Sequence, residues 1–275
     1  MSECLKDAPI GVFDSGFGGL TVVREIMRQI PNEKIVYFGD TARVPYGSKS
    51  KETVTRFSRQ ITHFLQTQNV KTIVVACNTA SAYALDELEK EIDIPMIGVV
   101  KPGAKVAAET TRNGKVGVIA TSATIGSEIY TTYIKDLKPE ISVTGKACPL
   151  FVPLVEEGLL EDPVTDEIAS RYLLELIDID IDTLILGCTH YPLIRNTIGR
   201  VMGDKVTLVN PAYETARELK CLLEEKNLLQ DKKPDLGENR YQFYVSDGAE
   251  KFKTFANSIL KYGILSAKTI NIEEY

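Results

Sequence analysis

The sequence predicts an α/β protein with two pseudo-symmetric, three-layer domains, mostly parallel sheets and an active site in the cleft between them. Strand-like and helix-like segments alternate along all 275 residues, which is typical of parallel sheets. Residues 72–79 and 183–190 share one order: a threonine, three branched aliphatic residues, a small residue, a cysteine and two polar residues. Residues 10–15 and 116–121 form a second matching pair of strand-like stretches.

The two matching pairs are offset by 111 and 106 positions along the chain. Two matches in the same order at nearly the same offset predict an internal duplication. The alternative is that buried strands of α/β proteins simply resemble one another. A duplication would place Cys77 and Cys188 on opposite walls of one cleft. Each cysteine follows a buried strand, and the carboxyl ends of strands are where open α/β sheets bind ligands.

In the first half of the chain, apolar runs that end in small or polar residues are typical of strands buried on both faces. We expect such strands at residues 10–13, 34–38, 72–75 and 95–100. Amphipathic stretches predict helices at about residues 20–30, 51–68 and 78–91. Asn78, Thr79 and Ser81 are the candidate caps of the third helix. Lys101-Pro102-Gly103 then predicts a crossing between domains.

The second half of the chain repeats the alternation. We expect strands at residues 115–120, 141–146, 183–187, 205–209 and 241–245. We expect helices at about residues 103–112, 121–124 onward, 164–177, 213–226 and 249–260. Residues 149–158 are interpreted as a loop with a short helix, and the polar residues 230–240 as a loose surface segment.

Composition limits the class of protein. The chain is 44% hydrophobic and 25% charged, which is ordinary for a globular protein. A net charge of −6 without a long basic run argues against a nucleic-acid partner. Neither a membrane span nor a signal peptide is expected, so we expect a cytoplasmic protein. Five widely spaced cysteines without a CxxC motif argue against a disulfide framework.

Two ligand-binding interpretations explain the residues poorly. Residues 14–19 follow a strand, as in a dinucleotide-binding turn, and Asp40 ends the next strand. The spacing is G-x-G-G, however, with Thr21 at the third glycine position, and the cysteines stay unexplained. A metal site would use Cys188 and His190, but His63 is the one other histidine and no further ligands have recognisable spacing.

Two catalytic interpretations use the cysteines. A single nucleophile, Cys188 with His190 as its base, leaves Cys77 without a role. Two thiols across a cleft can instead act as base and acid on opposite faces of one carbon, with Asp14 and His190 assisting. A free thiol has a pKa near ~8.5, so one thiolate and one thiol are attainable together near neutral pH. The remaining cysteines are interpreted as small buried residues: Cys4, Cys148 and Cys221.

Five motifs spread over nearly the whole chain resemble glutamate racemase, within the aspartate/glutamate racemase superfamily. They are Asp14-Ser15-Gly16-Phe17-Gly18-Gly19-Leu20, Phe38-Gly39-Asp40, Pro45-Tyr46-Gly47, Cys77-Asn78-Thr79-Ala80-Ser81 and Gly187-Cys188-Thr189-His190-Tyr191-Pro192. Aspartate and hydantoin racemases share the two-cysteine plan and remain alternatives, as do a non-catalytic amino-acid-binding clamp and a thiol-redox protein.

The resemblance implies an enzyme that interconverts L- and D-glutamate without a cofactor or metal and supplies D-glutamate for peptidoglycan. Glutamate is its expected partner, and a homodimer is an open possibility. It implies two domains, residues 1–99 with 211–275 and residues 100–210, which cross at Lys101-Pro102-Gly103 and Asn210-Pro211. Cys77 and Cys188 are the implied acid/base pair. The implied substrate-site residues are Asp14, Ser15, Tyr46, Gly47, Asn78, Thr79, Thr189 and His190, with Asp40, Thr121 and Glu156 as secondary candidates.

Overall fold

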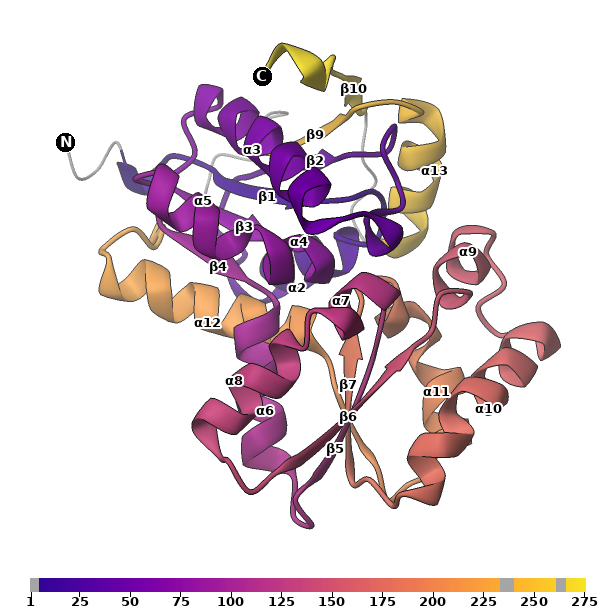
Figure 1. Ribbon diagram of the computed structural model, residues 1–275. Helices are drawn as coiled ribbons and strands as arrows, with labels where there is room; N and C mark the ends of the chain where they lie inside the picture. Colours follow the sequence, from indigo (N-terminus) through magenta and orange to yellow (C-terminus); the bar gives the residue numbers. More distant parts are fainter. Residues whose placement is uncertain (1–4, 233–239, 261–265) are drawn as a thin grey trace.

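Two parallel β-sheets, one in each half of the molecule, organise the fold (Figure 1). The computed structural model describes residues 5–232, 240–260 and 266–275. The larger sheet has the spatial order β10 (Lys268–Thr269), β9 (Tyr241–Val245), β2 (Ile35–Gly39), β1 (Ile10–Asp14), β3 (Thr72–Val75) and β4 (Met96–Gly98). The smaller sheet has the order β6 (Ser142–Ala147), β5 (Lys115–Ala120), β7 (Thr183–Gly187) and β8 (Thr207–Val209).

The two sheets share one plan of strands. In the larger sheet, β1 lies between β2 and β3, and β4 lies beside β3. In the smaller sheet, β5 lies between β6 and β7, and β8 lies beside β7. The register is also shared, because Ile10 pairs with Thr72 and Val116 pairs with Thr183. These four residues occupy matching positions in the two sequence repeats. The predicted α/β fold with two pseudo-symmetric halves is therefore confirmed, and every strand pair among the described residues is parallel.

Helices cover both faces of each sheet, which gives the three predicted layers. The larger sheet packs against α2 (Leu20–Gln29), α12 (Pro211–Glu225) and α13 (Ala249–Ile259) on one face and against α3 (Lys51–Thr67), α4 (Asn78–Tyr83) and α5 (Leu85–Glu91) on the other. The smaller sheet packs against α9 (Phe151–Glu156), α10 (Pro163–Asp178) and α11 (Arg195–Met202) on one face and against α6 (Val100–Thr110) and α8 (Ile129–Leu137) on the other.

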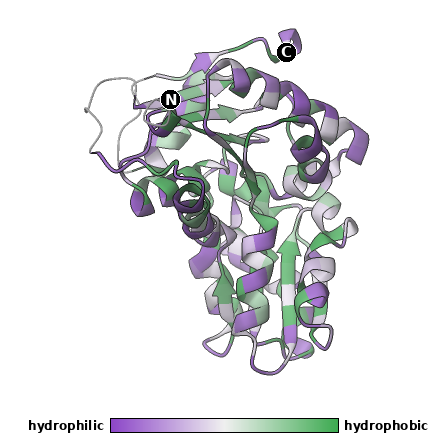
Figure 2. Ribbon diagram, turned by 90° about the vertical axis from the view of Figure 1, so that its left-hand side faces the viewer, coloured by the Kyte–Doolittle hydropathy of each residue, from purple (hydrophilic) through white to green (hydrophobic). Residues whose placement is uncertain are grey.

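Burial on both faces explains why the strands are continuous apolar runs. Ile10 and Val12 of β1 belong to the core beneath α2 and α12, whereas Phe13 belongs to the core beneath α3. Successive side chains of a strand point to opposite faces, so a strand between two helix layers must be apolar throughout. Figure 2 shows this distribution, with hydrophobic residues concentrated in the central strands and hydrophilic residues on the outer helices.

The structure adds detail to the expected elements. Lys101-Pro102-Gly103, the expected crossing between domains, lies in the first turn of α6. A proline in the first helical turn removes no intrahelical hydrogen bond, because the first four N–H groups have no partner there. The helix predicted after the first cysteine is divided at Ala84 into α4 and α5. Of the predicted loose segment at 230–240, residues 233–239 lie outside the described residues.

No helix in the described part of the chain is both long and apolar enough to cross a membrane. The longest helices, α3 and α10, each present one buried side and one exposed side. This is the pattern of helices that cover a sheet.

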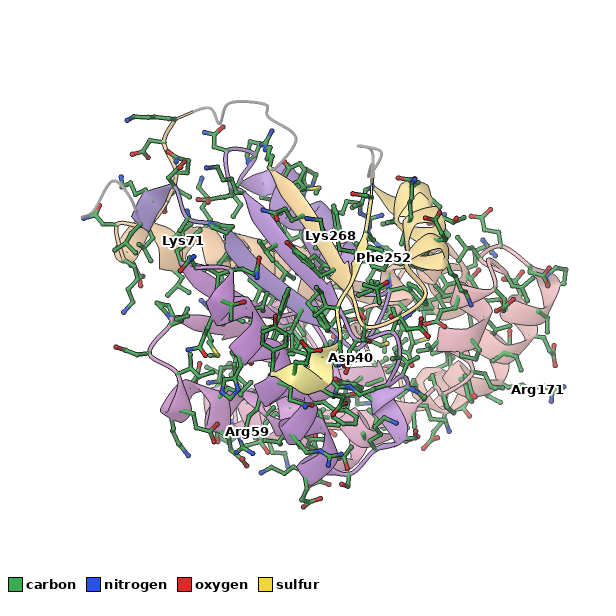
Figure 3. All side chains as sticks on the ribbon, turned by 90° about the horizontal axis from the view of Figure 1, so that it is seen from above. Asp40, Arg59, Lys71, Arg171, Phe252 and Lys268 are labelled. Atoms are coloured by element: carbon green, nitrogen blue, oxygen red, sulfur yellow. The ribbon has the colours of Figure 1, made fainter. Side chains whose placement is uncertain are left out.

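A buried ion pair stabilises the end of the larger sheet that lies away from the strand carboxyl ends. Lys71, which precedes β3, has a fully buried ammonium group 2.5 Å from Glu33 Oε2. The same ammonium donates to the carbonyl oxygens of Lys6 and Leu228, at 2.7 and 2.9 Å. Figure 3 labels Lys71 at this end and Asp40 at the other. Lys71 therefore ties together segments that are distant in sequence.

We expect Lys71→Met to lower the free energy of unfolding by about 3–5 kcal/mol, because it leaves the Glu33 carboxylate and two carbonyl groups buried without their partner. Lys34→Met is the matched control, since the Lys34 ammonium pairs with Asp7 at the surface and should contribute about 1 kcal/mol or less. Urea denaturation of both variants measures the difference. Equal losses in the two variants would contradict the role of the buried pair.

Candidate active site

One cavity of about 400 Å³ lies between the two sheets and contains both repeated cysteines. It opens where the carboxyl ends of β3 and β7 face each other, because Cys77 and Cys188 follow these strands within two residues. The residues predicted for the site that line this cavity are Ser15, Tyr46, Gly47, Cys77, Asn78, Thr79, Thr121, Glu156, Cys188, Thr189 and His190. The structure therefore brings together residues from distant parts of both repeats.

Cys77 lies at the start of α4 in a buried, acidic environment. Its Sγ accepts a hydrogen bond from the backbone N–H of Ala80 at 3.5 Å, so Cys77 caps this helix and the expected caps do not. Side chains with an acceptor atom suit this position because the first N–H groups of a helix lack partners. Burial and the charge of Asp14 raise the pKa of the Cys77 thiol to about 12. Cys77 is therefore protonated at neutral pH.

Cys188 lies in a different electrostatic environment, beside a histidine. Its Sγ is 3.8 Å from Nδ1 of His190, and Nε2 of His190 is 3.1 Å from Oε1 of Glu156. Burial lowers the pKa of His190, but the hydrogen bonds with Cys188 and Glu156 outweigh it and raise this pKa to about 10. An imidazolium beside a thiol stabilises the thiolate. The two cysteines thus face one cavity in opposite electrostatic settings.

Asp14 is not among the residues that line the cavity and lies behind them. Its side chain is fully buried, and its carboxylate oxygens accept hydrogen bonds from the N–H of Gly16 at 3.0 Å and from the Thr189 hydroxyl at 3.3 Å. Burial raises the pKa of Asp14. Because it acts on the pKa values of both Cys77 and His190, Asp14 can influence the site electrostatically from this second layer.

Asp40 also lies outside the cavity lining and supports the loop at its edge. It accepts hydrogen bonds from the Tyr46 hydroxyl, from Nε of Arg43 at 2.8 Å and from the Ser246 hydroxyl at 2.9 Å. Arg43 in turn pairs with Glu273 near the C-terminus at 3.0 Å. The carboxylate of Asp40, directly after β2, thus fixes Tyr46, which lines the cavity.

Hydroxyl groups link the two halves of the molecule beside Cys77. Thr79 Oγ1 lies 3.0 Å from Oγ1 of Thr121 and 3.0 Å from Oγ1 of Thr124. Thr121 follows β5 of the smaller sheet, whereas Thr79 follows β3 of the larger sheet. Gly47 packs against Thr121 so closely that an added Cβ would lie 2.6 Å from its Cβ. This position therefore requires glycine.

A second close contact lies beside Cys188. A Cβ added to Gly18, in the turn after β1, would collide with the Thr189 hydroxyl and the His190 imidazole. Thr21 supports the same contact by donating a hydrogen bond to the carbonyl oxygen of Thr189 at 2.9 Å. The glycine-rich turn that resembled a nucleotide-binding loop instead allows the backbone to approach the second cysteine motif.

The sequence interpretation missed seven cavity residues. Val152 and Pro153 of α9, together with Pro149, form an apolar part of the wall beside Glu156. The other missed residues flank predicted ones: Val44, Pro45, Ser48 and Ser122. The proline-rich run at 149–153 was visible in the sequence, but local patterns do not indicate which side of a short helix faces a cavity.

The other cysteines of the described residues, and His63, do not line this cavity. Cys148 is buried as expected, Cys221 is exposed on α12, contrary to expectation, and Cys4 lies outside the described residues. His63 is exposed on α3. Among the residues that the structure describes, no group of three or more histidine, cysteine or acidic side chains could hold a metal ion.

A second cavity, of about 390 Å³, lies on another side of the junction between the sheets. Its wall mixes apolar side chains with Lys101, Lys105, Glu89 and Glu218 and contains neither repeated cysteine. Both repeated cysteines therefore face the first cavity and not the second.

The fold and the site together define an α/β protein that presents two cysteine thiols to one cavity between two parallel sheets. Comparison with known proteins identifies the family. A family model described as Asp/Glu/Hydantoin racemase matches residues 10–219. The chain belongs to this family of racemases.

Individual relatives within the family are glutamate racemases. The curated enzyme from Geobacter metallireducens is 49% identical over 251 residues, which cover 91% of this chain and 92% of the relative. The crystal structure of a glutamate racemase from Bacillus anthracis matches with a TM-score of 0.92 and 41% identity, covering 96% of this chain and 98% of that one. The Francisella tularensis glutamate racemase in complex with D-glutamate matches with a TM-score of 0.90 and 40% identity, covering 98% and 100%.

The raised pKa of His190 predicts how stability depends on pH. The folded protein keeps this proton up to about pH 10, whereas an unfolded histidine loses it near 6.5. The contribution of His190 is thus fully present below pH 6.5 and is lost as the pH rises to 10. The free energy of unfolding should fall across this window by at most about 1.4 kcal/mol per pH unit.

Urea denaturation between pH 6.5 and 10 tests this expectation. His190→Asn should flatten the dependence, whereas His63→Asn, at the exposed second histidine, should leave it unchanged. An equally steep dependence in His190→Asn would show that another group causes it.

Proposed function

We propose that this protein interconverts L- and D-glutamate with two cysteines, one removing the proton from Cα and the other donating its own proton to the opposite face. The observation that carries the proposal is that Cys77 and Cys188 line one cavity in opposite electrostatic settings. Inversion at carbon requires a base on one face and an acid on the other. Cys77, held protonated by its raised pKa, and Cys188, 3.8 Å from the imidazole of His190, are placed to supply the acid and the base.

The steps of the reaction balance without a further reactant. The Cys188 thiolate takes the proton from Cα of one enantiomer, so that the C–H bond breaks and an S–H bond forms. The electron pair stays on Cα and is delocalised into the α-carboxylate. Cys77 then gives its proton to the opposite face of Cα and becomes the thiolate. The reverse reaction begins from this second protonation state.

Glutamate is supported as the substrate by the relatives and by the chemistry of the cavity. The Francisella tularensis enzyme was crystallised with D-glutamate. Among the described residues, the cavity wall contains no lysine or arginine. We propose that hydroxyl and amide groups bind the two carboxylates: Ser15, Asn78, Thr79, Thr121 and Thr189. Donors at the α-carboxylate would stabilise the negative charge that develops in the transition state.

His190, Asp14 and Glu156 assist in this proposal without exchanging a proton with the substrate. His190 stabilises the Cys188 thiolate. Glu156 orients the imidazole and favours its protonated form through the contact with Nε2. Asp14 keeps the proton on Cys77 through its negative charge. Tyr46 and Gly47 form the edge of the cavity, and Asp40 fixes Tyr46 from behind.

The wider setting follows from the same activity. We propose that residues 1–99 with 211–275 form one domain and residues 100–210 the other, so that the substrate binds in the cleft between them. D-Glutamate made in the cytoplasm would supply peptidoglycan synthesis. A homodimer is a further proposal, which sedimentation velocity of the purified protein would test.

Cys77→Ser and Cys188→Ser should each lower racemisation by about 10²-fold or more, because a general acid or base contributes about 10²–10⁴-fold. A serine hydroxyl is too weak an acid to replace a thiol. Proton NMR of L-glutamate in D2O, followed by chiral analysis, measures both loss of the α-proton and appearance of D-glutamate. Cys221→Ser, at an exposed position away from the cavity, is the control and should retain activity.

Each alternative function predicts a different result in this experiment. Near-normal racemisation by either cysteine variant would overturn the two-thiol mechanism. Exchange with aspartate or a hydantoin but not with glutamate would identify a related racemase. Binding of glutamate by the wild-type protein without α-proton exchange would identify an amino-acid-binding clamp. Loss of activity in reductant would indicate a thiol-redox protein.

A further inference from the structure

A buried tyrosine bridges the two cysteine-bearing segments. Tyr130 lies on α8, which covers the smaller sheet, and 3% of its surface is exposed. Its hydroxyl donates a hydrogen bond to Oδ1 of Asn78 at 2.7 Å. Asn78 follows Cys77 directly and belongs to α4, which covers the larger sheet. The hydrogen bond therefore crosses from one half of the molecule to the other beside a reactive thiol.

The ring of Tyr130 packs against the residue that precedes the second repeated cysteine. A Cβ added to Gly187 would lie 3.2 Å from Cε2 of Tyr130, and a Cβ added to Gly103 of α6 would lie 3.6 Å from Cε1. Gly187 directly precedes Cys188. The ring thus occupies the space that a side chain at Gly187 would need. One residue contacts the position before Cys188 with its ring and the position after Cys77 with its hydroxyl.

This hydrogen bond orients the Asn78 amide. Asn78 lines the cavity, and its side chain makes no other hydrogen bond among the residues that the structure describes. With Oδ1 held by Tyr130, the two N–H donors on Nδ2 remain available to the cavity. Burial raises the pKa of Tyr130, so its hydroxyl keeps its proton and stays a donor over the working pH range.

We infer that Tyr130 is a positioning residue for racemisation, acting through Asn78. Its hydroxyl holds the Asn78 amide with the N–H groups toward a substrate carboxylate, and its ring keeps the Cys77 and Cys188 segments at their working separation. This inference rests on the proposed function. Helix α8 thus affects how both thiols meet the substrate, although it contributes no residue to the cavity wall.

Tyr130→Phe tests the inference because it keeps the ring and removes only the hydroxyl. We expect kcat/KM for L- and D-glutamate to fall by about five- to tenfold, the size of one lost hydrogen bond. Tyr83→Phe is the matched control, since the Tyr83 hydroxyl also joins the two halves, donating to the carbonyl oxygen of Ala123 at 3.0 Å. That control should stay within about twofold of wild type. Thermal unfolding of both variants ensures that folded proteins are compared.

A double-mutant cycle with Asn78→Ala separates positioning from general support of the fold. If Tyr130 acts through Asn78, adding Tyr130→Phe to Asn78→Ala should change kcat/KM by less than about twofold. An undiminished five- to tenfold fall in the Asn78→Ala background would overturn the inference. So would an effect of Tyr130→Phe that is no larger than that of Tyr83→Phe.

The cycle also separates this inference from the proposed function. Failure of the wild-type protein to exchange the α-proton of glutamate would refute the proposed function, and with it the inference. Normal racemisation by the wild type together with unchanged activity in Tyr130→Phe would refute the inference alone.

Discussion

The shared register of two strand pairs is the constraint on which the site depends. β1 pairs with β3 as β5 pairs with β7, residue for residue along the repeated segments. Because all these strands are parallel, every one of them ends at the same edge of its sheet. A shift of one residue in either register would turn the segment that follows to the opposite face. The cavity can present Cys77 and Cys188 together because both registers are fixed by apolar side chains on two buried faces.

Cys77 and Cys188 are equivalent in the repeat but lie in different electrostatic surroundings, and this difference gives the site its chemistry. A two-base racemisation needs one cysteine as thiolate and the other as thiol. Here burial and Asp14 raise the pKa of Cys77, whereas the Cys188 sulfur lies 3.8 Å from the imidazole of His190. The asymmetry comes from residues that the duplication does not share. Asp14 ends β1, whereas Ala120 ends the matching β5, and Asn78-Thr79 corresponds to Thr189-His190.

Local signals in the sequence predicted the fold and the two cysteines of the cavity, whereas the resemblance to glutamate racemase implied most of the other cavity residues. Apolar runs indicate buried strands, and the residues that follow them must lie at the carboxyl edge. The features of the site that the sequence did not predict depend on tertiary contacts. Asp14 and Asp40 are not among the residues that line the cavity, and each carboxylate accepts a hydrogen bond from a segment distant in sequence. Tyr130 gave no local signal, since its hydroxyl meets Asn78, 52 positions earlier in the chain.

A cavity wall with neutral donors suits the proposed chemistry better than one with lysine or arginine. The thiolate must remain basic enough to take a proton from a very weak carbon acid, and a nearby ammonium group would stabilise the thiolate and reduce that basicity. Hydroxyl and amide groups can bind carboxylates without adding positive charge. His190 is the exception, and Glu156 and Asp14 offset its charge. Substrate affinity then depends on how well each neutral donor is aimed, which is why a hydroxyl behind the wall, such as that of Tyr130, can affect the reaction.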